Sequence, residues 1–328
     1  MAVTEHVEKW YTGTNRHKIG LTCALTACCL FGLSLIFTKT GVGGVSVLTL
    51  ISWRFLIACT AMTILIITGV FKVNFRGKPL RGLLEIAVFA PVVYFLAEGW
   101  GLQLTTASEG AAILATGPIV IMVLSMLILK ENPTLRQAAA IVVAVAGVIV
   151  IIVAKGLSAD FVPAGYLFMF LAIMADAMCV ILTRKHLVYS PLERVYGMAV
   201  MGAAVFTPLA LYEHIAAGTL REYLLLPLTD SGFLAAVLYL GLISSVTGFT
   251  LYAVGIRYLG PNKMASLSGI TTIITVLAGV VFLKEAFTFL QGLGTLLIIG
   301  GAYCANTGSA KASGSATLTE RPSNPHTE

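Results

Sequence analysis

The sequence predicts an all-α integral membrane protein of ten transmembrane helices, arranged as two inverted five-helix repeats. Two observations lead to this prediction. Of the 328 residues, 58% are hydrophobic and only 11% are charged, which is less than half the charged fraction of an ordinary soluble domain. A nine-residue turn, LKENPTLRQ at 129–137, also returns as LKEAFTFLQ at 283–291 between long apolar runs. The first observation indicates that the bilayer is the solvent, and the second indicates a duplication.

Several apolar runs are long enough to cross a bilayer as helices. The stretches 19–38, 110–129 and 264–283 each contain twenty residues without a charge, and twenty helical residues extend about 30 Å, the thickness of the hydrocarbon core. The first run is too long for the apolar part of a secretion signal and no small-residue cleavage site follows it, so we expect it to be retained. Interruptions by Gly, Pro and polar residues give ten predicted spans, near 19–38, 47–68, 83–104, 110–129, 135–154, 164–183, 195–212, 232–256, 264–283 and 287–306.

The spans divide the chain into four predicted parts. These are a cytoplasmic segment at 1–18, a first five-helix repeat at 19–155, a second at 156–306, and a tail at 307–328 whose Gly, Ser, Thr and Pro content predicts disorder. With the N-terminus inside, sixteen Lys and Arg residues fall in inner segments and four in outer segments. Because cytoplasmic loops keep the positive charges, both termini are predicted to be cytoplasmic. The net charge of +6 reflects this sidedness rather than a nucleic-acid partner, and we expect a multi-pass protein of the cell membrane, the inner membrane in a bacterium.

The register of the two copies extends beyond the doubled turn. At the same offset of 154 residues, Gly101 matches Gly255 and Gly147 matches Gly301, whereas earlier in each half the offset is 145. Because five spans are an odd number, the second unit must enter the membrane from the opposite side, and inverted repeats of this kind are typical of secondary transporters. The alternative is that duplication only made a stable bundle, in which the threonines of the turn are helix caps.

Several motifs together resemble one transporter family. They are L-x-E-x-x-T-x-x-Q at the end of both halves, FGLSLIFTK at 31–39, WRF at 53–55 and TTASEGAAILATGPI at 105–119. Over residues 19–306 the chain is similar to the EamA-type, ten-helix branch of the drug/metabolite transporter superfamily. The resemblance implies a central cavity lined by helices one to four and six to nine, with helices five and ten at the periphery. It also implies transport of a small metabolite, with export of an amino-acid-like or amphipathic solute as the first expectation. The family usually has Gly three residues after the Gln, and Ala140 departs from this pattern.

Two charges lie inside the predicted spans at a similar depth. Arg54 is about 12 Å from the outer end of span two, and Glu98 is about 9 Å from the outer end of span three, at 1.5 Å per residue. A charge at the centre of a span costs about 2.5–3.5 kcal/mol on insertion scales, so it faces the protein interior or a wet cavity. We interpret Glu98 as a site for a cationic group or a proton and Arg54 as a guide for a carboxylate. The alternative is a buried ion pair that only fixes helix packing.

Asp176 is the deepest acid in the sequence, about 18 Å into span six. It matches Phe31 of the first half at the offset of 145, so an aromatic ring and a carboxylate face one shared centre. We interpret Asp176 as a candidate for proton or substrate coupling, with a helix–helix hydrogen bond as the alternative. Tyr94 and Tyr252 are candidates to line the same cavity, or else belong to the interfacial aromatic belt.

The fourth span carries a break and a cap. Thr116 and Pro118 interrupt it about half-way, where Pro removes a backbone donor, and Thr272 stands opposite them in the repeat. Carbonyls and hydroxyls exposed there could coordinate a substrate, as in transporters with broken helices. The alternative is a kink of the kind that membrane helices tolerate. At the start of the span, Thr106 and Glu109 fit a capping box.

Other function classes find little support in the sequence. The motif G-x-x-x-x-G-K-[ST] is absent, so no direct ATP drive is encoded. All five histidines lie outside the spans or at their ends, which argues against an enzyme with buried His chemistry, and the six cysteines fall in apolar runs, which supports neither disulfides nor a metal site. We therefore expect no catalytic residue, metal or cofactor. The expected partners are a small-molecule substrate, the lipid bilayer and, as an open alternative, a coupling proton, with the chain as a monomer or homodimer. A channel, a flippase for a lipid-linked substrate and an importer of a small organic cation remain as rivals.

Overall fold

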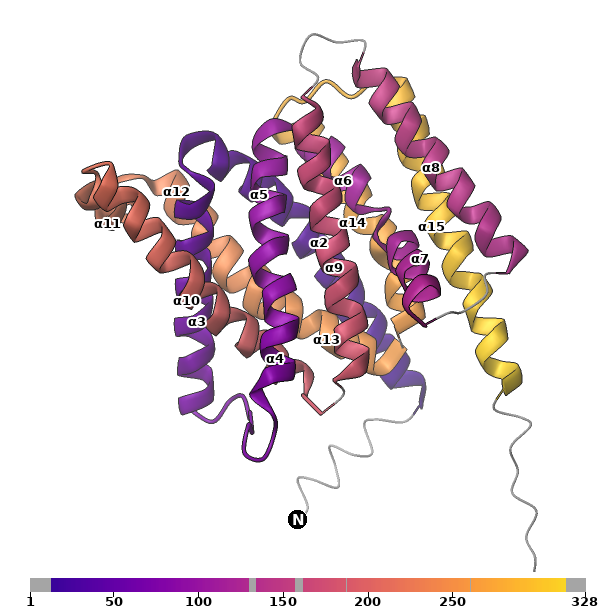
Figure 1. The fold of residues 1–328 in the computed structure, drawn as a ribbon, viewed down its shortest axis with the longest axis horizontal. Helices are drawn as coiled ribbons and strands as arrows, with labels where there is room; N and C mark the ends of the chain where they lie inside the picture. Colours follow the sequence, from indigo (N-terminus) through magenta and orange to yellow (C-terminus); the bar gives the residue numbers. More distant parts are fainter. Residues whose placement is uncertain (1–12, 130–133, 157–161, 187, 260, 317–328) are drawn as a thin grey trace, which may run out of the picture.

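The computed structural model describes residues 13–129, 134–156, 162–186, 188–259 and 261–316, and in these ranges the chain forms helices and no strand (Figure 1). The helical elements are α2 (Gly13–Gly44), α3 (Val47–Ile67), α4 (Leu80–Ala87), η1 (Val88–Val93), α5 (Tyr94–Leu104), α6 (Ala107–Leu114), α7 (Gly117–Leu129), α8 (Leu135–Gly156), α9 (Pro163–Lys185), α10 (Pro191–Ala216), α11 (Leu220–Thr229), α12 (Ser231–Leu238), η2 (Tyr239–Gly248), α13 (Phe249–Leu259), α14 (Pro261–Phe282) and α15 (Phe289–Ala316). Among the described residues, eight helical segments are long and apolar enough to cross a membrane, and Leu267–Phe282 and Phe289–Cys304 are shorter apolar helices. The predicted all-α class is confirmed, with eight candidate membrane spans.

The main contacts of a helix in one half of the chain have counterparts at the equivalent helix of the other half. Helix α2 packs on α13 and α14, and in the same way α9 packs on α5 and on α6 and α7. Three further contacts join equivalent elements of the two halves, namely α3 with α10, α6 with α14, and α8 with α15. The bundle is therefore built from two similar units that pack against each other.

Helices α8 and α15 pack together at one edge of the bundle (Figure 1). A Cβ atom added to Gly147 would lie 2.6 Å from the carbonyl oxygen of Gly294, and one added to Gly301 would lie 2.8 Å from that of Ala140. Small residues thus allow the two backbones to approach closely, as is common between membrane helices. The peripheral position that the resemblance implies for helices five and ten is confirmed, and Ala140 does not prevent close packing there.

Each copy of the doubled turn caps the helix that follows it. In the second copy, Gln291 Oε1 accepts a hydrogen bond from the Thr288 amide at 2.8 Å, and Thr288 Oγ1 accepts one from the Gln291 amide at 3.3 Å. Thr134 and Gln137 repeat this arrangement at 2.9 and 3.3 Å. The capping interpretation is confirmed for these residues, whereas 130–133 of the first copy lie outside the described residues.

Glu285, in the second copy of the turn, also binds the first half of the chain. Its carboxylate accepts hydrogen bonds from the amides of Ala107 and Ser108 at 2.7 and 3.0 Å and from Ser108 Oγ at 2.6 Å. These donors lie at the start of α6, where free amides favour a negative charge. Beside them, Gln291 Nε2 donates to Glu109 Oε1 at 3.0 Å, and the capping box predicted at this helix start is present. The turn therefore joins the two halves, a contact that the sequence did not predict.

One additional helix and two helix boundaries differ from the prediction. Helix α11 lies in the long loop expected after span seven, where it buries Tyr223 and exposes Leu224 and Leu228. Helix α2 begins at Gly13, inside the segment expected to precede the membrane, and α15 extends beyond the predicted end of span ten, to Ala316. Apolar composition marks the part of a helix that lies in lipid, and polar turns beyond it can remain helical. Residues 1–12 and 317–328 lie outside the described residues.

Candidate functional site

Four of the predicted site residues come together on three helices. Arg54 belongs to α3, Tyr94 and Glu98 to α5, and Asp176 to α9. The Tyr94 hydroxyl donates a hydrogen bond to Glu98 Oε1 at 2.8 Å. Arg54 and Asp176 both lie close enough to Tyr94 and Glu98 to interact with them electrostatically. One cation, two acids and a phenol thus form a single cluster, which we call the polar centre.

Arg54 is only 3% exposed, and its guanidinium is held from two sides. Its Nε donates to Ser245 Oγ at 3.1 Å, and its Cζ lies 4.2 Å from the centre of the Phe95 ring, a cation–π geometry. Within the described residues Arg54 forms no direct ion pair with Glu98, although the two lie close enough to interact electrostatically. Its terminal amino groups also have no hydrogen-bond partner in this part of the chain, which leaves a buried fork of N–H donors open.

The two acids of the polar centre are also incompletely bonded. Glu98 is 5% exposed, and among the described residues only its Oε1 atom has a partner, the Tyr94 hydroxyl. Asp176 is partly buried and makes no hydrogen bond or ion pair with any described residue. The helix–helix hydrogen bond considered for Asp176 is therefore not formed. A carboxyl group that lacks a protein partner inside a membrane bundle is available to bind a cationic group or a proton.

An aromatic cluster lies next to the polar centre. The ring of Phe31 on α2 lies 5.0 Å from that of Phe249 and 5.9 Å from that of Tyr252, both on α13. Tyr252 is close enough to Asp176 to interact with it electrostatically. The sequence-predicted residues Phe31 and Tyr252 are thus brought to the same region as the polar centre, rather than to an aromatic belt.

The two clusters occupy equivalent places in the two halves of the chain. Phe31 and Asp176 match at the offset of 145, and Glu98 and Tyr252 match at the offset of 154. The α5–α9 contact carries the two acids, and the equivalent α2–α13 contact carries the two aromatic residues. We call the first pair the acidic wall and the second pair the aromatic wall. The site is therefore asymmetric in chemistry although its framework is repeated.

A π-helical segment directly precedes each of the helices that carry Glu98 and Tyr252. It is η1 before α5 and η2 before α13. In the first half, η1 contains Ala90, with non-helical φ and ψ of −133° and 110°, and Pro91, which lacks an N–H donor. In the second half, η2 contains Ser245, which occupies the repeat position equivalent to Pro91, at the offset of 154. Ser245 Oγ donates to the Leu240 carbonyl at 2.8 Å, so it bonds a carbonyl of the widened turn while it accepts from Arg54. Such π segments are frequent at functional sites.

Sequence reasoning missed these interruptions and the residues they position. Ser245, Phe95 and Phe249 all contact the predicted site residues. A signal was available, because Pro91 falls inside span three, Ser245 is a polar residue inside span eight, and Phe95 matches Phe249 at the offset of 154.

The break predicted in span four is present but has a different use. Helix α6 ends at Leu114 and α7 begins at Gly117. Thr116 Oγ1 donates to the Ile113 carbonyl at 2.7 Å, and Thr272 Oγ1 donates to that of Ala111 at 3.3 Å. The Thr116 hydroxyl therefore bonds a backbone carbonyl at the break itself. The Thr272 hydroxyl bonds one across the contact between α14 and α6. Among the described residues, no hydrogen bond, ion pair or ring contact links Thr116, Pro118 or Thr272 to the polar centre.

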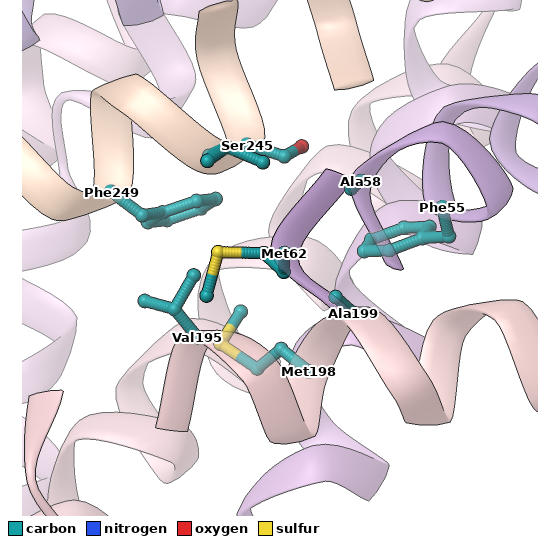
Figure 2. A pocket seen from close by; sticks show the side chains of 9 residues that line it. Phe55, Ala58, Met62, Val195, Met198, Ala199, Ser245 and Phe249 are labelled. Carbon is teal, nitrogen blue, oxygen red and sulfur yellow. The ribbon is translucent and has the colours of Figure 1, made fainter. Parts of the chain in front are cut away.

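A small apolar pocket includes Ser245, the hydrogen-bond partner of Arg54, among its lining residues (Figure 2). It is formed between α3, α10 and the η2–α13 segment, and of the nine described residues that line it only Ser245 is polar. Figure 2 shows the side chains of Met62, Val195 and Met198 pointing toward one another below the ring of Phe249. The pocket has room for little more than one water-sized group, so these apolar side chains pack closely beside Ser245.

Comparisons with known proteins agree with this architecture. The model of the EamA-like transporter family matches residues 18–153 and again residues 163–307. A Bacillus subtilis protein named as the uncharacterized transporter YcxC is 33% identical over 298 residues, which cover 90% of this chain and 93% of the relative. A Salmonella typhimurium protein named probable amino-acid metabolite efflux pump is 24% identical over 285 residues, 85% of this chain and 92% of the relative.

A solved crystal structure has the same fold. It aligns with a TM-score of 0.55 at 19% identity, over 94% of this chain and 99% of the solved one. Family models that match both halves, together with apolar helices long enough to cross a membrane, identify the chain. It belongs to the EamA-like transporter family of the drug/metabolite transporter superfamily, and it is a multi-pass membrane transporter.

Proposed function

We propose that the chain is a secondary active transporter that moves a small metabolite by alternating access to the polar centre. The observation that supports this proposal most directly is that Arg54, Glu98 and Asp176 lie in one cluster with hydrogen-bonding capacity that no described residue fills. Charged groups inside a membrane bundle are costly and are usually retained for binding or coupling. Arg54 would bind a carboxylate through its open N–H fork, and the acidic wall would bind an ammonium group or a proton.

The proposed topology is ten spans in two inverted repeats, with both termini in the cytoplasm. The eight candidate spans and the two shorter apolar helices together supply ten helices, and the paired contacts between the halves fit an exchange of two equivalent units. Labelling of single cysteines introduced at Lys130 and Lys284, in a variant without the six native cysteines, tests this topology. We expect the two positions to react from opposite sides of the membrane. Reaction from one side would contradict the inverted arrangement.

The proposed cargo is amino-acid-like or amphipathic, and the proposed direction is export. An amino acid carries both a carboxylate and an ammonium group, which the polar centre can bind at the same time. The name of the Salmonella relative points to the same class and direction. Protonation of Glu98 or Asp176 after release of the ammonium group would couple transport to a proton gradient.

A screen of solute uptake in proteoliposomes, with and without a pH gradient, tests cargo and coupling together. We expect saturable uptake of amino-acid-like solutes that the gradient accelerates. Flux that does not saturate would indicate a channel, and competition by a lipid-linked compound would indicate a flippase.

A small organic cation is a second candidate cargo, because the acidic wall and the aromatic wall adjoin. Carboxylates attract a cation, and the faces of Phe31 and Tyr252 can bind it by cation–π contact. In the same screen, uptake of a quaternary ammonium compound that does not need Arg54 would favour this candidate, because such a cation has no carboxylate for Arg54 to bind.

A further inference from the structure

We propose that helix α11 is a membrane-surface helix, which lies in the interfacial layer of the bilayer and binds lipid through the side chains of Leu224 and Leu228. The partner is a lipid surface, and the contact is separate from the polar centre. The proposal therefore goes beyond transport of a solute, and its failure would leave the proposed transport function unchanged.

The place of α11 in the chain puts it at one surface of the membrane. The candidate span Pro191–Ala216 ends before it, and the candidate span Ser231–Leu259 begins after it. The helix has ten residues and extends about 15 Å, which is half the thickness of the hydrocarbon core. Figure 1 shows it at the edge of the bundle away from α8 and α15. Helix α11 therefore connects two spans at the membrane surface without crossing the bilayer.

Tyr223 fixes the depth of α11 against the first half of the chain. Its side chain is fully buried, and its hydroxyl lies 3.1 Å from Ser52 Oγ on α3. Its ring lies 4.9 Å from that of His214 and 5.6 Å from that of Trp53. Ser52 is about 8 Å along α3 from Val47, where that helix begins. Helix α11 is therefore level with the first turns of α3, in the range of about 5–10 Å to which interfacial helices bury their apolar face.

The exposed surface of α11 is apolar on one side and charged on another. Leu224 and Leu228 are 52% and 82% exposed, and they share a face of the helix because they are four residues apart. At about 100° per residue, the exposed Glu222 is turned away from both of them by about 120–160°. Leu225, which is 39% exposed, lies between these two sides. A helix with this pattern that is too short to span the bilayer is typical of the membrane interface.

The exposed leucines follow directly on a part of α10 that faces lipid. Tyr212 and Ile215, in the last turns of that candidate span, are 74% and 62% exposed. Arg221 is exposed beside the leucine side of α11, and an Arg side chain can keep its apolar stem along lipid while the guanidinium reaches the phosphates. This continuity with a membrane span favours lipid over a second copy of the chain as the partner of α11.

The experiment uses the full chain, without its six native cysteines, in nanodiscs of phosphatidylcholine. Leu224→Cys, Leu228→Cys and Glu222→Cys are each labelled with bimane. Quenching by iodide in water is compared with quenching by phosphatidylcholine that carries a doxyl group near the headgroup. We expect loss of fluorescence with the doxyl lipid at both leucine positions, and little loss with iodide. Glu222→Cys, the matched control on the same helix, should show the reverse order.

Val200→Cys gives the reference for a lipid-facing position within a span, because Val200 lies on α10 and is 40% exposed. Thermal unfolding checks that each labelled variant is folded, and Leu228→Cys, at the most exposed leucine, decides the question if Leu224→Cys is not. Iodide quenching at Leu228→Cys as strong as at Glu222→Cys would place α11 in water and overturn the proposal. Protection of Leu228→Cys from both quenchers would also overturn it, and cross-linking between copies at that cysteine would then identify the partner as a second copy of the chain.

Discussion

Arg54 Nε donates to Ser245 Oγ at 3.1 Å, and this hydrogen bond joins helix α3 of the first half to the π-helical segment η2 of the second. The two residues are 191 positions apart in the chain. Because the bond orients the guanidinium, it also fixes the direction of the N–H fork that we propose for carboxylate binding. Its loss should affect stability and affinity together.

Ser245→Ala is expected to lower the free energy of unfolding by about 1–3 kcal/mol, since it leaves a buried Nε donor without its acceptor. The affinity for the transported solute should fall as well. Ser244→Ala is the matched control, because Ser244 is fully buried and its hydroxyl has no hydrogen-bond partner among the residues that the structure describes. Thermal unfolding in detergent and uptake kinetics measure both effects. Equal behaviour of the two variants would show that the Arg54 contact has no energetic role.

Asp176→Asn is expected to reduce transport by about tenfold or more while stability changes by less than about 0.5 kcal/mol. The reason is that Asp176 has no hydrogen bond or ion pair with the described residues, so the substitution removes a binding group without removing a structural contact. Uptake in proteoliposomes and thermal unfolding are measured on the same preparation. A large loss of stability would instead assign Asp176 to helix packing.

Glu98→Gln is expected to flatten the dependence of transport on pH, because the amide keeps the hydrogen bond from Tyr94 but cannot bind a proton. Uptake is measured across a range of pH values on either side of neutrality. Glu222→Gln provides the control, since Glu222 is an exposed acid on α11. A pH profile that keeps its shape in Glu98→Gln would remove Glu98 from the coupling scheme.

Glu285→Ala is expected to lower the free energy of unfolding by about 2–3 kcal/mol, the cost of losing charge-assisted hydrogen bonds at a helix start. Its carboxylate binds two amides and the hydroxyl of Ser108. Chemical or thermal denaturation in detergent gives the value, with Glu222→Ala as the exposed control. If Glu285→Ala is no less stable than that control, the link through the turn contributes nothing to the bundle.

Gly301→Ala and Gly300→Ala form a matched pair on α15. The added methyl group of the first would lie 2.8 Å from the Ala140 carbonyl oxygen, whereas that of the second meets no atom of the described residues within 4 Å. We expect Gly301→Ala to destabilise the chain by about 1–3 kcal/mol through overpacking. Gly300→Ala should stabilise it by about 0.5–1 kcal/mol through helix propensity. The check is the unfolding temperature of each variant. If Gly301→Ala shifts it in the same direction as Gly300→Ala, relative to the unmodified chain, then α8 and α15 tolerate a wider separation.

Much of this architecture could be predicted from residue order, because its signals are local. A charge in an apolar run is visible without a structure, which is why Arg54, Glu98 and Asp176 were identified. The capping box at Glu109 and the doubled turn were visible for the same reason, since each depends on neighbours within a few positions.

The features that were missed depend on contacts between distant segments or on an unusual backbone. Ser245 becomes a partner of Arg54 only when η2 packs on α3. The attachment of Glu285 to α6 crosses 178 positions of sequence. Helix α11 is held by Tyr223, whose hydroxyl lies 3.1 Å from Ser52 Oγ on another helix. No periodicity within one segment could reveal these contacts.

The two π-helical segments stand at corresponding places, with η1 at Val88–Val93 and η2 at Tyr239–Gly248. A widened turn of this kind is uncommon, and its independent origin twice at one position would be a coincidence. The simplest history is that a single ancestral five-helix gene already carried the irregular turn before it was copied and fused. Pro91 and Ser245 occupy the same position of this repeated irregular turn, so the two halves place different chemistry on one shared backbone feature.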